Sequence, residues 1–467
     1  MEYNLSLAEF QSGKMFDSNR KFIHKTGNRF KLFPFVTQPN SVPVEDLSQL
    51  VGTFLCKIEG KKPDKIAVSE LVAELKQETD IEAGQEQLFY ETVKQLFFTS
   101  NEQLRPLNLQ MLSHIPHKEV SEEKVADYLV DVLGNKDNLK RMVTNAKTRE
   151  LAFSNVFERL VLKHLKSSDE KNTDDIPYYG VVTSLTEVFE SDFKYILGNQ
   201  NRVREYLVTL LELYFFSYTA QTSLQLDRFL DGERSINIPL YFCLDWEKTS
   251  QSRQCFTDGW QRLQYSVEKM FAHVVTLEIL NHTEPGSERF DYIALRKYLD
   301  ENPEKEIDIA QTIDDLTSLY RQSITDCAEM SELKKENDED QVLASLKFLF
   351  ASVKCQFENT VRARAYNSYA GKYESFCHKY LKSRGRSGLM LSLSEETLIF
   401  LTKISIKDNE QMRLKSYEPS YVLTAMGIPT EKIENTVRIS WGAESDCEDV
   451  VTSFKELLAV AKSFAAF

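Results

Sequence analysis

YLVTLLELYFFSY, residues 206–218, is the stretch that decides the fold, because it is apolar on nearly every side of a helix. A helix without a polar face is stable only when other parts of the protein surround it. The rest of the chain suits long helices, since it has only 16 Gly and 12 Pro among 467 residues and both residue types interrupt helices. We therefore expect a mainly α protein built around a buried helix at residues 206–218.

Changes in composition divide the chain into blocks. SSDEKNTDD, residues 167–175, has the polar composition of a linker between an N-terminal and a central helical domain. Residues 236–246, INIPLYFCLDW, predict a small β element, which Pro239 confines to a sheet edge. The expected units are an irregular basic N-terminal arm (1–45), an N-terminal helical domain (46–166), a central helical domain (176–388), a partial winged-helix-like module that opens with two short helices (389–415) and a short α/β C-terminal tail (416–467).

The overall charge limits which partners the protein binds. Lys and Arg number 57 and Asp and Glu 71, a net charge of −14, so nucleic acid or anionic lipid requires a local basic patch. The seven cysteines are widely spread without a CxxC pair, which disfavours a disulfide framework and a zinc knuckle and fits a reducing compartment. No apolar run approaches the roughly 18 residues of a membrane span, and the N-terminus lacks a signal-peptide pattern. We expect a cytoplasmic protein without membrane contact.

Charge also segregates along the chain. Residues 300–340 form an acidic belt with 14 acidic and 4 basic residues, which predicts a hydrated surface or a flexible connector. Residues 362–386 hold seven cations against one glutamate, and their aromatic residues recur at the helical spacings 3 and 4. We expect a helix over 362–386 whose aromatic face lies in the core and whose cations face solvent or DNA phosphates. The aromatic face consists of Tyr366, Tyr369, Tyr373, Phe376 and Tyr380.

A second basic segment lies in the N-terminal arm, where residues 14–31 hold six cations and one aspartate. Cations that neutralise phosphates give affinity for DNA without reading its sequence. The candidate DNA-binding residues of the two segments are Lys21, Lys25, Arg29, Arg362, Arg364, Lys372, Lys379, Lys382, Arg384 and Arg386.

Motifs of common enzyme chemistry do not occur in the sequence. It has no GxxxxGK or GxGxxG phosphate loop and no GxSxG nucleophile elbow. His114 and His117 flank a proline and lack a third metal ligand, and Pro63-Asp64-Lys65 is not followed by the ExK of a nuclease. We expect no cofactor, no metal and no catalytic residue. A cryptic metal-dependent nuclease is the alternative.

EPSYVLTAMG, residues 418–427, and RISWG, residues 438–442, resemble the C-terminal end of DndA-type cysteine desulfurases. The resemblance implies that Arg438 matches the arginine that holds the substrate carboxylate in that family. The family's catalytic cysteine is missing, because residues 408–417 read DNEQMRLKSY, and the large domain with the cofactor lysine does not precede this tail. The resemblance therefore implies a vestigial carboxylate-binding residue and no active desulfurase.

IHKTGNRFKLFPF (23–35), FCHKYLKSRGR (376–386) and LIFLTK (398–403) resemble the DptG-type component of the DNA phosphorothioation-dependent restriction system. The resemblance implies a defence-complex subunit whose partners are DptF- and DptH-like proteins and double-stranded DNA. We expect a non-catalytic subunit that bridges these proteins and contacts the DNA backbone. A sulfur-handling accessory that binds a cysteine desulfurase, using Arg438 and Cys447, is a further alternative.

Overall fold

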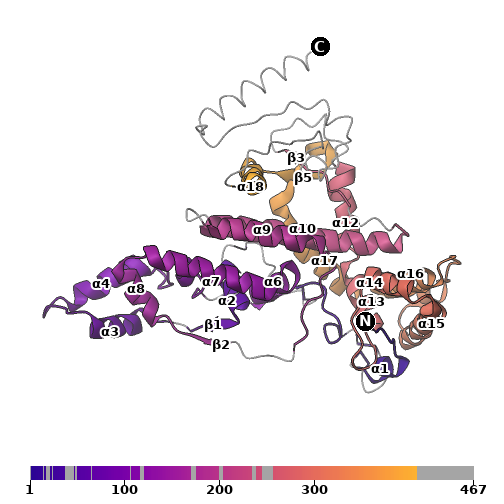
Figure 1. Ribbon diagram of the computed structural model, residues 1–467. Coiled ribbons are helices and arrows are strands. Elements are labelled where there is room, and N and C mark those ends of the chain that lie inside the picture. Colours follow the sequence, from indigo (N-terminus) through magenta and orange to yellow (C-terminus); the bar gives the residue numbers. More distant parts are fainter. Residues whose placement is uncertain are drawn as a thin grey trace, which may run out of the picture.

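The computed structural model of this protein is mainly α-helical, as predicted (Figure 1). It describes residues 2–13, 15–16, 22–23, 25–36, 47, 50–64, 66–105, 107–115, 120–169, 175–198, 203–233, 238–244 and 256–407. The predicted C-terminal tail, with Arg438, lies outside these residues, and so does Lys21. Within the described part of the chain, no helix combines the length and the apolar character that crossing a membrane requires.

The predicted buried helix lies at the centre of the molecule. It is part of α10 (Val203–Leu230), which runs across the body in Figure 1 and packs against α9 (Ser184–Gly198) and α12 (Arg262–Val267). Leu207, Leu211 and Phe215 are each at most 1% exposed. Helices of the N-terminal and central domains touch different sides of α10, which explains why it has no polar face.

The N-terminal helical domain extends from this centre as an elongated lobe (Figure 1). Its helices are α2 (Leu50–Glu59), α3 (Val68–Glu78), α4 (Glu86–Phe97), α5 (Leu109–Leu112), α6 (Val120–Leu133), α7 (Lys136–Phe153) and α8 (Val156–His164). α2, α6 and α7 join the main core, whereas α3, α4 and α8 surround a second, smaller core that includes Leu71, Val93 and Val161. The far end of the lobe therefore has a hydrophobic core of its own.

The predicted linker at residues 167–175 begins as a strand instead. β2 (Ser167–Asp169) pairs antiparallel with β1 (Lys61–Pro63), with Lys61 opposite Asp169. The polar composition of a linker is also that of an exposed two-stranded ribbon, so composition alone did not separate the two. β2 thus pairs with a strand that itself contacts α2.

The acidic belt is not a flexible connector. Its longest ordered element is α15 (Glu306–Ser323), which packs against α16 (Gln341–Asn359) in the lobe that also holds α13 (Met270–Leu280) and α14 (Tyr292–Glu301). α15 buries Ile313 and Leu316 completely. Its carboxylates occupy the other helix face, so the helix is amphipathic despite its net charge. Short 3₁₀ turns, Pro303–Lys305 and Ala328–Ser331, flank α15.

The predicted small β element is present at the end of the quoted segment. β3 (Cys243–Leu244) pairs in parallel with β5 (Leu389–Leu393), and β4 (Leu381–Ser383) pairs antiparallel with β5. The strand order β3-β5-β4 puts β3 at an edge, as Pro239 predicts.

The helix predicted over 362–386 is shorter than expected. α17 (Ala363–Cys377) ends before β4, and Gly385 and Gly388 have φ angles of 61° and 81° in the connection between β4 and β5. Glycine adopts positive φ without the steric cost of a side chain, so these residues favour the reversal over a continued helix. A π-helical turn, Phe256–Gln261, packs on β5.

The first of the two short helices expected within residues 389–415 is present among the described residues. The described part of residues 389–415 consists of β5 followed by one helix, α18 (Glu395–Ile406). The Ser394 hydroxyl accepts a hydrogen bond from the Thr397 amide, so Ser394 caps the helix. The later apolar positions of the predicted module, including Leu414, lie outside the described residues.

Asp291 caps α14 and gives the fold a pH-dependent stability. Its carboxylate accepts a hydrogen bond from the Ala294 backbone N–H at 2.7 Å. Burial raises the pKa of Asp291 to about 6 despite this hydrogen bond. The folded state therefore binds this proton more tightly than the unfolded state does, and stability falls as pH rises from about 4 to about 6. The difference amounts to about 3 kcal/mol.

We predict that Asp291→Asn removes this dependence, since asparagine caps helices equally well without a charge. Urea unfolding of both proteins at several pH values between 4 and 7 measures it. The variant should gain stability relative to the parent protein as pH rises, and equal slopes for the two proteins would contradict the prediction.

Candidate nucleic-acid interface

The N-terminal arm lies along α17, so the two basic segments meet in space. Arg362 Nη2 is 3.5 Å from the Phe22 carbonyl oxygen, the Tyr369 hydroxyl donates to the Phe33 carbonyl at 3.5 Å, and the Lys372 ammonium donates to the Val36 carbonyl. These pairs are separated by more than 330 residues in the sequence. The arm is irregular as predicted, apart from α1 (Leu7–Ser12), but it belongs to the core.

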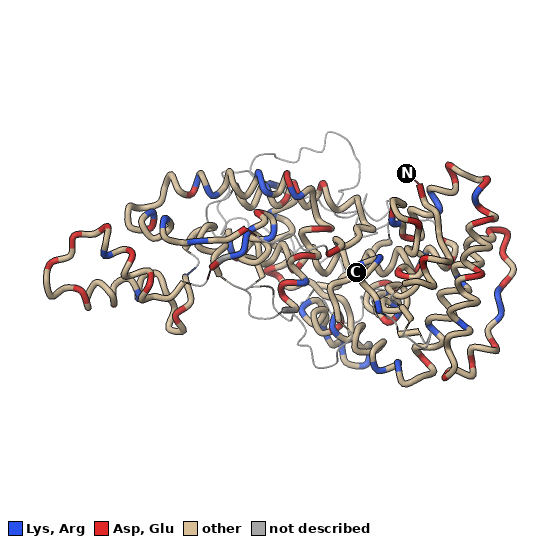
Figure 2. Tube along the Cα trace, turned by 90° about the horizontal axis from the view of Figure 1, so that it is seen from below, with Lys and Arg blue, Asp and Glu red and all other residues tan. Residues whose placement is uncertain are grey.

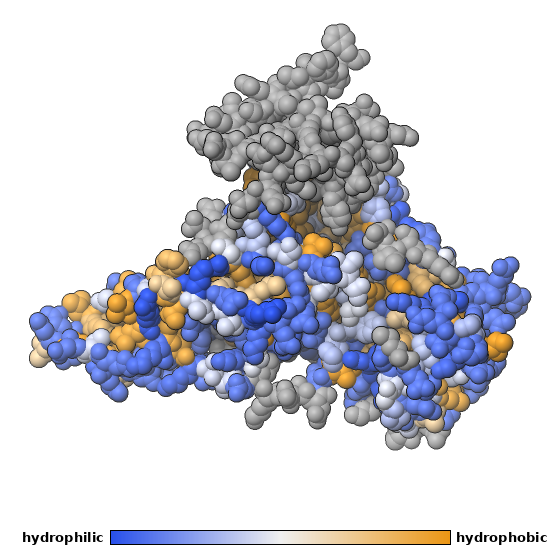
Figure 3. Space-filling model, in the orientation of Figure 1, coloured by the Kyte–Doolittle hydropathy of each residue, from blue (hydrophilic) through white to orange (hydrophobic). Residues whose placement is uncertain are grey.

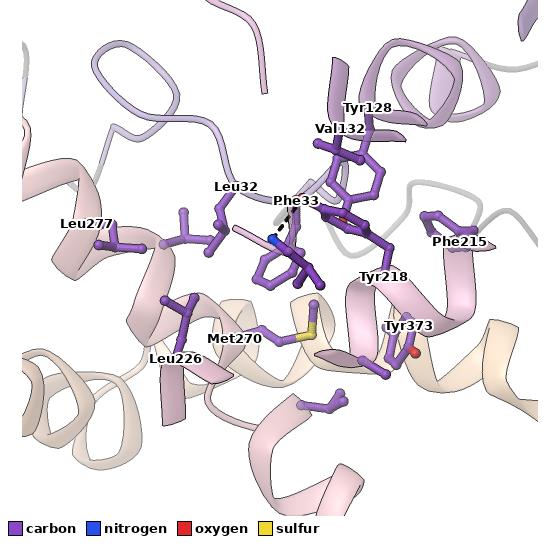
Figure 4. Close-up of a cluster of buried hydrophobic side chains, with 14 of the residues drawn as sticks. Leu32, Phe33, Tyr128, Val132, Phe215, Tyr218, Leu226, Met270, Leu277 and Tyr373 are labelled. Atoms are coloured by element: carbon purple, nitrogen blue, oxygen red, sulfur yellow. Dashed lines mark hydrogen bonds between the residues drawn. The ribbon is translucent and has the colours of Figure 1, made fainter. Parts of the chain in front are cut away.

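Figure 4 shows how deeply the arm enters the core. Leu32 and Phe33 lie between side chains of α6, α10 and α13, and Tyr373 of α17 lies beside Phe215 of α10. Leu32 is 1% exposed and Phe33 5%. The arm is therefore fixed by burial of its own apolar residues, and its cations are held at defined positions.

Glu278 anchors the basic part of the arm. This residue of α13 is fully buried, and its carboxylate accepts the backbone amides of Gly27, Asn28, Arg29 and Phe30 at 2.9–3.1 Å. Burial raises its pKa, and the four N–H groups oppose that rise. The sequence analysis missed Glu278, although a single glutamate in the apolar run MFAHVVTLEIL was a visible signal.

The predicted aromatic face of α17 is confirmed as core. Tyr366, Tyr369, Tyr373 and Phe376 are at most 6% exposed, and Tyr380, which lies just beyond the helix, is 5% exposed. The Tyr373 hydroxyl donates to a carbonyl oxygen of α10 at 2.8 Å. Because the aromatic face of α17 is buried, only the other faces of this helix can present cations to solvent.

Cations lie at the start of α17 and in the adjoining arm. Lys25 and Arg364 are exposed, Arg362 is half-buried, and Arg29 pairs with Glu9 at 2.7 Å. Among the described residues, no side-chain hydrogen bond or ion pair engages Lys25 or Arg364. These two cations are the ones this end presents to a partner.

A second group lies just beyond the other end of α17, whose 15 residues span about 22 Å at 1.5 Å per residue. Arg386 is exposed, Lys382 is half-buried, Lys379 pairs with Glu212, and Arg384 donates to the Leu244 carbonyl at 2.7 Å. Figure 2 shows Lys and Arg interspersed with Asp and Glu along the trace. The cations predicted to lie on one basic helix therefore form two separate groups, one near each end of α17.

Lys372, in the middle of α17, does not belong to either surface. It is 8% exposed, its ammonium is directed at the arm, and burial lowers its pKa. The charge count placed it among the candidate DNA-binding cations, but the arm covers this side of the helix. Lys372 joins the arm to α17 and does not present its charge to DNA.

A buried charged network, which the sequence analysis missed, lies behind α17. Lys269 Nζ is 2.7 Å from Asp227 Oδ1, the Ser266 hydroxyl donates to Asp227 at 3.0 Å, and His273 Nε2 lies 3.9 Å from the same carboxylate. Burial lowers the pKa of His273. The pKa of Asp227 is also lowered, because His273 and Lys269 outweigh the effect of its burial. The network ties α10 to α12 and α13.

Two open cavities of about 430 Å³ each border this network. The Tyr265 side chain lines both, and its ring covers the Lys269 ammonium at 3.5 Å. In the described part of the chain, no group of three or more His, Cys, Asp or Glu side chains is arranged to hold a metal ion. His114 of the histidine pair is half-buried and directs Nδ1 at the Gln110 carbonyl.

No family model matches the chain, and no curated protein matches it.

Proposed function

We propose that this chain is a non-catalytic subunit of a phosphorothioation-dependent DNA restriction complex, in which it bridges partner proteins and contacts the DNA backbone. The observation that carries the proposal is the docking of the N-terminal arm along α17. It brings residues 23–35, one segment on which the resemblance to the DptG-type component depends, against the helix that leads into the other, residues 376–386. The partners are DptF- and DptH-like proteins.

The contact with DNA uses the two basic ends of α17. Arg364 and the arm residue Lys25 lie at one end, and Arg386 lies in the β4–β5 connection beyond the other end. α17 itself spans about 22 Å, less than one turn of B-DNA, about 34 Å, so we expect a single duplex to reach both ends. Such contacts supply affinity and position without sequence readout.

We predict that the triple variant Lys25→Ala, Arg364→Ala, Arg386→Ala binds duplex DNA more weakly and with less salt dependence. Each phosphate neutralised contributes about 0.9 to the slope of log affinity against log salt, so the slope should fall by about 2 to 3. Fluorescence anisotropy with a labelled duplex at several salt concentrations measures it. The matched control is Lys76→Ala, Lys140→Ala, Lys334→Ala, which removes three exposed cations from α3, α7 and the loop before α16.

Equal salt slopes for the two triple variants would contradict the DNA contact. The same preparations also test the nuclease alternative: nicking of the duplex by the purified chain that depends on added Mg²⁺ or Mn²⁺ would replace the non-catalytic role by an enzymatic one.

A further inference from the structure

The far end of the N-terminal helical domain exposes large apolar side chains. Figure 3 shows apolar side chains gathered over α4 and α8 at this end of the molecule. Val156 is 83% exposed and Phe153 75%. The full set, called the apolar end from here on, is Leu88, Leu96, Leu107, Leu151, Phe153 and Val156. Single exposed apolar residues are ordinary, whereas a group on one small subdomain marks a binding surface.

The apolar end is a preformed surface. The Phe157 ring of α8 packs edge-on against Phe97 of α4 with 5.2 Å between centroids and lies 6.4 Å from Phe89. Val156 and Leu96 are the chain neighbours of these packed rings. α4 and α8 are thus held together by the second core, so a partner meets an ordered surface and loses little conformational freedom of this chain on binding.

Acidic side chains flank the apolar residues of α4. Asp80, Glu82, Glu86 and Glu91 are exposed, and none forms an ion pair with any described residue. Of the nearby cations, Lys94 is paired with Glu102 at 2.8 Å, and Arg159 of α8 donates to the Ala152 carbonyl at 3.1 Å. A complementary partner therefore offers apolar side chains bordered by lysine or arginine.

We propose that the apolar end binds an amphipathic helix of another protein, whose apolar face covers Leu88, Leu96 and Val156 and whose flanking cations approach Glu86 and Glu91. A helix laid on an apolar surface is a common mode of peptide recognition. A second copy of this chain fits poorly, because a two-fold interface would bring the same unpaired carboxylates together. This inference rests on the bridging part of the proposed function and names the chemistry of the partner.

The test uses the full chain and a labelled model peptide with leucines along one helical face and lysines on both flanks. Its counterpart carries glutamate in place of lysine. We expect the lysine peptide to bind and the glutamate peptide to bind at least about tenfold more weakly. The variant Leu88→Gln, Leu96→Gln should lower affinity for the lysine peptide at least about tenfold, because two leucines lose their apolar contacts.

The matched control is Ile307→Gln, Ile399→Gln, which changes two residues that are 70% and 60% exposed elsewhere. Thermal unfolding checks that both variants keep the parent fold. Equal binding of the two peptides, or unchanged affinity of Leu88→Gln, Leu96→Gln, overturns the proposal. Self-association of the chain that this variant abolishes would assign the surface to a second copy and overturn it as well. The DNA salt slope of the same variant should stay unchanged, so failure here is distinct from failure of the DNA contact.

Discussion

Replacement of Glu278 by glutamine is expected to destabilise the protein by on the order of 4 kcal/mol and to loosen the N-terminal arm. The carboxylate accepts four backbone amides between Gly27 and Phe30. A glutamine keeps one acceptor oxygen and presents an NH₂ group to two of these amides, which lose their acceptor inside the protein. Each buried N–H left unsatisfied costs about 1–3 kcal/mol.

Denaturant unfolding of Glu278→Gln measures the loss of stability, with Glu284→Gln as control because Glu284 is exposed just after the same helix. Limited trypsin digestion adds a local readout, since Lys25 and Arg29 lie in the anchored segment. Cleavage there should become faster in Glu278→Gln only. A variant with parent-like stability and parent-like cleavage would show that the four hydrogen bonds do not hold the arm.

Replacement of Lys269 by methionine is expected to cost about 3–5 kcal/mol, because it leaves the buried carboxylate of Asp227 without its cation. Lys269 is 6% exposed and Asp227 4%. The double variant Lys269→Met, Asp227→Asn removes both charges from the interior, and we expect it to be more stable than Lys269→Met alone. The loss in the single variant is then mainly the penalty of an unpaired buried charge.

Urea unfolding of the two single variants and the double variant completes a double-mutant cycle. Residues in direct contact typically couple by about 0.5–3 kcal/mol, and this pair should lie at the upper end. Additive effects of the two substitutions would mean that the 2.7 Å pair contributes no coupling to the fold.

Local sequence patterns predicted the secondary structure correctly where the residues of a single element were sufficient to determine it. The apolar run at residues 206–218 lies in α10, the aromatic residues of α17 are buried, and Pro239 precedes an edge strand. Patterns failed where a distant partner decided the outcome. The helix expected to reach residue 386 stops at Cys377 because residues 381–383 pair with β5. Residues 306–323 of the acidic belt form an ordered helix because α16 covers its apolar face.

The candidate site shows the same division. Charge counts located both basic segments and made Lys372 and Arg364 equal candidates, whereas the structure buries Lys372 under the arm and exposes Arg364. Glu278 binds backbone N–H groups of the arm, and Asp227 pairs with Lys269. Neither contact could be predicted from the sequence, because the partners are far apart in the chain and no motif contains both. The exposed carboxylates beside Leu88 contribute to a predicted binding surface only because the tertiary structure leaves apolar side chains exposed next to them.

The sequence by itself determined that this protein is mainly α-helical, that an aromatic face of residues 366–380 is buried and that its cations are concentrated in two segments. These properties depend on composition and on spacings of three and four residues, which a helix converts directly into faces. Only the tertiary structure decided that the N-terminal arm lies on α17, which of the cations reach the surface, and that one end of the N-terminal domain remains apolar and uncovered. Those outcomes depend on contacts between residues up to 340 positions apart, because burial and ion pairing are properties of neighbours in space and not of neighbours in the chain.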